Sequence, residues 1–228
     1  MNFRRYKKNT YTEENIFWAS MSDLLLGLCI VFIVLFALSM IGLTKKNMEQ
    51  EQIKQNISEK LIEKFQKEHI KVEVNKFSGN IKISDLELFD LNKSEISQKG
   101  KKFLDKITPI YLDTLLEDPE IRKNLDQIII EGHTDSHSFA NSGSEEENYV
   151  KNLDLSTKRA SSVAAYMVTK NYDNTLIKLL SVNGRSFSDP VLINGKEDFN
   201  KSRRVELKFR IKDYSFIDVI KKLTPQKS

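Results

Sequence analysis

The sequence predicts an α/β protein in which a single N-terminal transmembrane helix is followed by a helical linker and then by helices packed on one sheet. Three observations indicate this: an uncharged apolar run near the N-terminus, a polar stretch without Gly or Pro after it, and alternating strand and helix patterns from residue 70. With 39% hydrophobic residues among 228, wholesale disorder is excluded. One cysteine excludes a disulfide framework, and a net charge of +4 does not indicate a nucleic-acid partner.

The first element is a membrane anchor. From Leu24 to Thr44 there are 21 residues without a charge, and 17 of the 20 from Leu24 to Leu43 are hydrophobic. Twenty helical residues rise about 30 Å, the thickness of the hydrocarbon core of a bilayer. The alternative, a buried helix of a soluble domain, is disfavoured because such a helix is rarely apolar on all sides over this length. A cleavable signal peptide has a shorter apolar run and a small-residue cleavage site, and neither is found here.

Basic residues set the expected orientation. Arg4, Arg5, Lys7 and Lys8 precede the span, which favours an N-terminus in the cytoplasm. Since no second apolar run follows, we expect the C-terminal part to lie outside the cytoplasm.

Asp23 is the only charged residue between Asn15 and Thr44. An ionised carboxylate inside a membrane costs about 2.5–3.5 kcal/mol on insertion scales, so such residues usually face protein or water. Gly27, one turn further along, would admit a closely packed partner helix. Asp23 is therefore a candidate for carrying a transported ion, together with helices from a partner. The alternative is an interfacial capping residue, with Ser20 or Ser22 in a similar role.

The polar stretch at 45–69 carries one apolar stripe, because Ile53, Ile57, Leu61 and Phe65 recur every four positions. Such a narrow stripe suits a parallel dimer contact, or a helix packed on the membrane or on the next domain. An amphipathic linker helix is the simplest interpretation.

The rest of the chain alternates strands and helices. Expected strands lie at 71–75, 80–84, 126–132, 179–183 and 204–211. Expected helices lie at 97–116 and 156–171, the second with Ser156 as its candidate N-cap.

Four blocks of this region carry a resemblance. They are Leu88-Phe89-Asp90-Leu91-Asn92, Gly132-His133-Thr134-Asp135, the set Asn152, Leu155, Ser156, Arg159 and Ala160, and Arg203-Arg204-Val205-Glu206. In this order they strongly resemble the OmpA-like peptidoglycan-binding domain, over about residues 70–212. The resemblance implies that Asp135 and Arg159 hold the diaminopimelate residue of the stem peptide. A carboxylate suits its ammonium group and a guanidinium suits its carboxylate. The same resemblance assigns Thr134, Asn152, Asn92 and Arg203 to the binding site.

The chain departs from the family pattern twice. The loop at 136–151 is longer than usual and acidic, and the sequence does not indicate its role. Ser202 stands where the family usually has Asn, which would weaken a supporting hydrogen bond.

Other kinds of site were weighed against this one. His133, Asp135 and His137 alternate and have suitable ligand types for a metal, but the family motif already accounts for the first two. Since no Ser or Cys is placed with a general base in a defensible motif, we expect no enzyme activity, no metal and no cofactor.

The apolar segment carries a second resemblance. The stretch Phe17-Trp18-Ala19-Ser20-Met21-Ser22-Asp23-Leu24-Leu25 ahead of an OmpA-like domain resembles the B subunit of bacterial motor stators (the MotB-like family). That resemblance implies a homodimer bound to a multi-span A-type subunit in the bacterial inner membrane, with Asp23 carrying H⁺ or Na⁺. The Phe-Trp start favours the B component of a Zorya anti-phage system slightly over a flagellar stator. A passive wall tether without ion transport is the alternative.

Together these arguments divide the chain into five segments. They are a cytoplasmic N-terminus (1–15), a transmembrane helix (16–44), a helical linker (45–69), an OmpA-like peptidoglycan-binding domain (70–212) and a C-terminal tail (213–228).

Overall fold

The computed structural model describes residues 10–91, 93–137, 143–170 and 174–213. The chain forms two compact units, Met1–Gln50 and Glu51–Ser228, and one helix, α1 (Thr10–Lys67), contributes to both. No break in the helix marks the predicted border between span and linker at residue 44.

In the first unit, α1 carries a long apolar stretch whose side chains are exposed. Its most apolar 18-residue window has a mean hydropathy of 3.1 and buries nothing within the chain, so this helix is long and apolar enough to cross a membrane. The helix begins at Thr10, before the expected start at residue 16. Asp23 therefore lies more than three turns inside it, and the capping interpretation is wrong.

The second unit is built on a five-stranded sheet in the order β1-β2-β7-β3-β4. Only β3 and β4 run parallel; the other neighbours are antiparallel. The strands are β1 (Glu73–Val74), β2 (Ile81–Ser84), β3 (Leu125–His133), β4 (Leu180–Gly184) and β7 (Arg204–Ile211). All five predicted strands are thus present, and the last has the predicted bounds.

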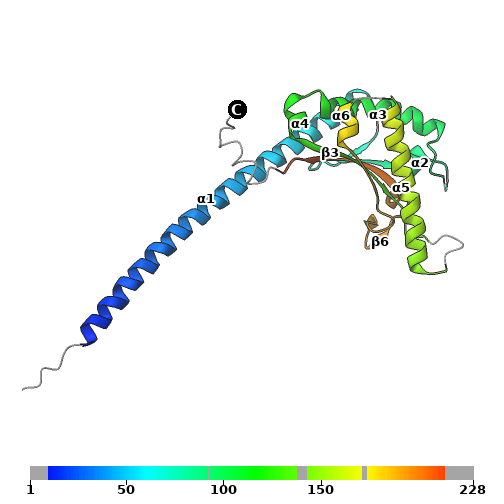
Figure 1. Cartoon of the computed structure of the whole chain (residues 1–228). Coiled ribbons are helices and arrows are strands. Elements are labelled where there is room, and N and C mark those ends of the chain that lie inside the picture. The colour runs from blue at the N-terminus through cyan, green and yellow to red at the C-terminus, as the bar shows by residue number, and fades with distance from the viewer. Residues whose placement is uncertain (1–9, 92, 138–142, 171–173, 214–228) are drawn as a thin grey trace, which may run out of the picture. The chain divides into compact units, whose positions relative to one another are not determined.

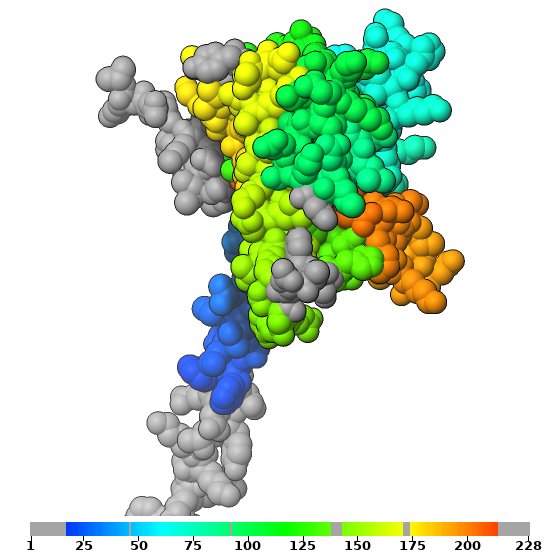
Figure 2. All heavy atoms as spheres, turned by 90° about the vertical axis from the view of Figure 1, so that its right-hand side faces the viewer, coloured from blue at the N-terminus to red at the C-terminus, as the bar shows by residue number. Residues whose placement is uncertain are grey.

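Helices lie mainly on one side of this sheet, with α3, α4 and α6 above it and β6 below it in Figure 1. The helices are α2 (Asp85–Leu88), α3 (Gln98–Leu116), α4 (Pro119–Asn124), α5 (Glu145–Lys170), α6 (Asn174–Leu179) and α7 (Phe199–Ser202). A small hairpin pairs β5 (Leu192–Ile193) with β6 (Lys196–Glu197). In Figure 2 this orange region protrudes beside α5, which is yellow-green.

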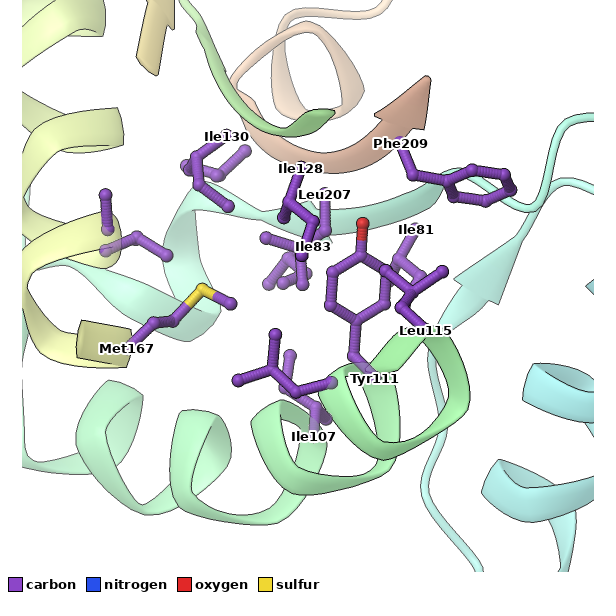
Figure 3. Packing of buried hydrophobic residues seen from close by; sticks show 14 of the residues in the cluster. Ile81, Ile83, Ile107, Tyr111, Leu115, Ile128, Ile130, Met167, Leu207 and Phe209 are labelled. Atoms are coloured by element: carbon purple, nitrogen blue, oxygen red, sulfur yellow. The ribbon is translucent and has the colours of Figure 1, made fainter. Parts of the chain in front are cut away.

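The core lies between the sheet and the helices. Alternate residues of the central strands, such as Ile128, Ile130 and Leu207, point toward Tyr111 of α3 and Met167 of α5 (Figure 3). The Tyr111 hydroxyl donates a hydrogen bond to the carbonyl oxygen of Lys208 at 2.9 Å, so this fully buried side chain is not left with an unsatisfied donor.

The apolar stripe of the linker belongs to this core. Ile57, Leu61 and Phe65 are buried and Ile53 is partly buried in the hydrophobic cluster. Of the three contacts that the stripe allows, packing on the following domain is the one observed.

The start of α5 was predicted wrongly. It begins at Glu145, three turns before Ser156, so Ser156 is not an N-cap and much of the expected acidic loop is helical. The three acidic residues Glu145, Glu146 and Glu147 form the first turn, where the helix dipole favours negative charge. The Ser144 hydroxyl accepts a hydrogen bond from the amide of Glu147 at 3.2 Å and provides the cap.

Candidate ligand-binding site

Three strand ends meet at one edge of the sheet. The order β2-β7-β3, with Ser84 and His133 both opposite Arg204, places the end of β2, the start of β7 and the end of β3 side by side. Asp85 follows β2, Arg203 precedes β7, and Asp135 comes two residues after β3. The amide of Asp85 also donates to the carbonyl oxygen of Arg203 at 3.1 Å. Residues from positions 85, 135 and 203 are thereby brought together.

Helix α5 supplies the fourth charge. It packs on β3 and β4, and Gly132 allows the close approach. A Cβ at Gly132 would lie 2.1 Å from the carbonyl oxygen of Ser156, which no other residue could tolerate without moving the helix. Arg159 lies about one turn after Ser156 on the same buried face. The glycine of the Gly-His-Thr-Asp motif therefore sets the position of Arg159.

The four charges form two ion pairs, and the pairing differs from the expected one. Arg203 donates from Nη1 to Oδ2 of Asp135, whereas Arg159 forms an ion pair with Asp85, with 3.1 Å between Nη2 and Oδ2. Asp135 and Arg159, predicted to act together, lie in one cluster, but each has another partner.

The two pairs differ in exposure. The side chains of Asp85 and Arg159 are 5% and 4% exposed, against 9% and 24% for Asp135 and Arg203. The second pair is thus nearer to solvent.

Burial and neighbouring charges act on the inner pair together. Burial raises the pKa of Asp85. The positive charges of Arg159 and Arg203 oppose that shift, whereas the negative charge of Asp135 adds to it. Burial likewise lowers the pKa of Arg159, against the attraction of Asp85 and Asp135. With two carboxylates and two guanidinium groups the cluster is formally neutral, so it suits a ligand that carries both an ammonium group and a carboxylate.

The other predicted residues are placed less directly. Thr134 is buried, its amide donates to the carbonyl oxygen of Ser186 at 2.9 Å, and its hydroxyl has no hydrogen-bond partner among the described residues. Asn152 is buried on α5, where its Nδ2 donates to the backbone oxygen of Asn148 at 3.1 Å. Asn92 lies outside the described residues.

Ser202 does form a supporting hydrogen bond. Its hydroxyl accepts from the amide of Val191 at 3.0 Å and is fully buried. The bond ties the segment before β5 to the start of β7, next to Arg203.

Among the described residues, His133, Asp135 and His137 do not group as metal ligands. His137 Nδ1 lies 3.3 Å from Oδ2 of Asp135, whereas His133 Nε2 lies 3.1 Å from Oε1 of Glu131. Glu131, His133 and Glu206 form a separate buried group with ligand atoms within 4.8 Å of one another. Lys208 contacts both of its carboxylates and Arg204 also pairs with Glu206, so two cations of the chain already neutralise this group.

Asp85 is the site residue that sequence reasoning missed. The only signal for it was an acidic residue directly after a predicted strand. Its role depends on the register of β2 against β7, which the sequence does not state.

Comparison with known proteins decides the family. The model of the OmpA family matches residues 88–204, just over half of the chain, and includes Asp135, Arg159 and Arg203. The chain belongs to the OmpA family. This confirms the family expected from the four sequence blocks.

Relatives extend beyond the OmpA-family region. The chain is homologous to the Zorya protein ZorB from the Crooks strain of Escherichia coli, with 29% identity over 214 residues, covering 86% of this chain and 88% of that protein. ZorB from Escherichia coli O139:H28 is 27% identical over 228 residues, covering 91% and 86%. The crystal structure of a protein described as MotB-like, from Desulfovibrio vulgaris, has the same fold. It is 17% identical with a TM-score of 0.54, covering 74% of this chain and 98% of that one.

Proposed function

We propose that this OmpA-family protein is a peptidoglycan-anchored subunit of a stator-like membrane motor, of the kind that serves in Zorya anti-phage defence. The observation that carries the proposal is the cluster of two carboxylates and two guanidinium groups at one edge of the sheet. It stands in an OmpA-family domain that follows an apolar segment (16–44) with one carboxylate, Asp23.

The ligand is the diaminopimelate residue of the peptidoglycan stem peptide. The free end of this residue carries an ammonium group and a carboxylate, which replace the contact between Asp135 and Arg203. The ligand ammonium group approaches Asp135, and the ligand carboxylate approaches Arg203 and Arg159. The greater exposure of Asp135 and Arg203 supports this order of contact. Charge-assisted hydrogen bonds and a planar guanidinium provide affinity and geometric selectivity.

Location follows from the ligand. Peptidoglycan lies outside the plasma membrane, so the domain is on that side and the N-terminus with its four basic residues is in the cytoplasm. The chain is then a single-pass protein of the bacterial inner membrane.

Ion transport is assigned to Asp23. The side chain lies inside a continuous helix, exposed on its surface, among apolar residues. Because a carboxylate facing lipid is costly, it packs against other chains: a second copy of this chain and a multi-span A-type subunit. The names of the two homologues favour a defence motor over a flagellar one. A passive tether would need the same domain but not Asp23.

The test of wall binding uses the full chain in detergent, sedimented with purified sacculi. We expect Asp135→Asn and Arg203→Gln to lose most of the bound fraction, since removing one partner of a buried charge pair costs about 2–5 kcal/mol. Matched controls are Asp154→Asn and Lys158→Gln, an exposed pair on α5 at 2.6 Å that we expect to leave binding unchanged. Equal sedimentation of all variants would remove the cluster from the binding site.

A further inference from the structure

Asp85 is the charged group of the cluster that no family motif assigns. It begins α2 directly after β2, and its side chain is almost completely buried. Oδ2 pairs with Arg159, whereas Oδ1 has no hydrogen-bond partner among the described residues. A buried carboxylate with an unsatisfied oxygen is costly, so its presence here calls for a reason beyond packing.

That reason lies in how Arg159 is held. The guanidinium has three contacts: Nη2 to Asp85, Nε to the carbonyl oxygen of Lys93 at 3.1 Å, and the ring of Phe89 at 5.3 Å from the guanidinium carbon. The carbonyl oxygen of Lys93 holds the Nε edge of the guanidinium group, and the ring of Phe89 lies against its face. Asp85 is the only one of the three that also carries a charge opposite to that of Arg159.

We propose that Asp85 is a positioning residue for ligand recognition, which holds the Arg159 guanidinium in the orientation that receives the ligand carboxylate. This inference rests on the proposed binding of diaminopimelate. The role proposed for Asp85 is to hold Arg159 through the ion pair at 3.1 Å, and not to contact the ligand itself. Its effect is therefore expected on the preference for a ligand with a carboxylate, and not on binding of the rest of the stem peptide.

Acid titration gives a second signature. The groups that face Asp85 are Arg159 from α5, Arg203 from the residue before β7, and Asp135 from the segment after β3. Burial raises the pKa of Asp85 more than the two cations lower it. As pH falls through this raised pKa, Asp85 becomes neutral and Arg159 loses its counter-ion. Binding should weaken over that range in the wild type, whereas Asp85→Asn should lack that step.

The experiment compares two soluble muropeptides by calorimetry on the full chain in detergent. One carries meso-diaminopimelate and the other carries lysine at the same place, which lacks the terminal carboxylate. In Asp85→Asn we expect the preference for diaminopimelate to fall by about tenfold, by analogy with the lower end of the effect of losing a supporting group behind a metal ligand. Asp85→Glu, which keeps the charge but moves it by one methylene, should recover part of the preference. Asp154→Asn is the control and should keep all of it.

Each outcome decides between the two proposals. A wild-type chain that shows no preference for diaminopimelate contradicts the proposed function itself. A wild-type preference that is unchanged in Asp85→Asn, with the same pH profile, overturns the role of Asp85 alone. If Asp85→Asn does not fold, Asp85→Glu decides, because a preference equal to that of the wild type would also overturn it.

Discussion

The acidic residue of the apolar segment and the four buried acidic residues of the domain lie in opposite environments. In the apolar helix, Asp23 is exposed and pairs with no residue in the part of the chain that the structure describes. In the domain, Asp85, Asp135, Glu131 and Glu206 are all buried, and each contacts a cation of the same chain. These four buried carboxylates thus find their cations within the domain, whereas Asp23 has none among the described residues. The contrast agrees with the proposed function, in which the domain anchors the chain and the helix packs against partner chains.

The largest expected effect is that of Asp23→Asn, which tests the first half of the contrast. Asparagine keeps the size and polarity but cannot ionise, so transport and the activity of the motor should be lost completely. Because a neutral amide is less costly to insert than a carboxylate, the protein level should stay normal. The measurements are the membrane level by immunoblot and phage resistance or motility in the host.

Ser22→Ala is the matched control for that experiment. The Ser22 hydroxyl donates to the carbonyl oxygen of Trp18 at 2.8 Å, within its own helix, so its loss should leave activity intact. Full activity of Asp23→Asn at normal protein level would identify the chain as a passive tether.

The second prediction breaks a buried pair in the domain. Arg159→Met leaves Asp85 buried without its counter-ion, which should lower the free energy of unfolding by about 3–5 kcal/mol. Replacing both residues, as Asp85→Leu with Arg159→Met, should recover most of this loss because no charge is then left unpaired. Urea unfolding of the detergent-solubilised chain, followed by near-UV circular dichroism, measures both.

Lys158→Met controls for the position on α5. Its ammonium group pairs with exposed Asp154, and such surface pairs contribute about 0–1 kcal/mol. Equal losses for Arg159→Met and Lys158→Met would mean that the inner pair is no more important to the fold than a surface one.

The same contrast shows which features the sequence could predict. Strand β7 was predicted with its observed bounds because apolar and charged residues alternate along it. The helix predicted at 97–116 is observed as α3 (Gln98–Leu116), with Ser97, which was not predicted as a cap, at its N-cap position. These features depend on neighbours in the sequence. The start of α5 was missed because three consecutive acidic residues resemble a solvated loop as much as a helix start.

The site was predictable only in part, for a related reason. Asp135 and Arg203 carry family motifs, and the structure brings them into contact. Asp85 has no motif, and its pairing with Arg159 depends on strand register and on the close approach of α5 at Gly132. Interactions between residues 74 positions apart are set by the fold and not by local pattern.

The smallest expected effect concerns the buried group of Glu131, His133 and Glu206. It tests, through the pH dependence of stability, whether a buried carboxylate of the domain contributes through its charge. The hydrogen bond with His133, and then the contact with Lys208, lowers the pKa of Glu131 to about 2, from a usual value of 4.5. A carboxylate with a lowered pKa contributes stability that is present above its unfolded pKa and is lost as pH falls toward the folded one. Glu131→Gln should therefore cost on the order of 3 kcal/mol at pH 7, and the difference from the wild type should shrink between about pH 5 and pH 2. Asp154→Asn, an exposed acid, should differ little from the wild type throughout. A cost of Glu131→Gln that is the same at pH 7 and pH 2 would show that the side chain contributes packing and not charge.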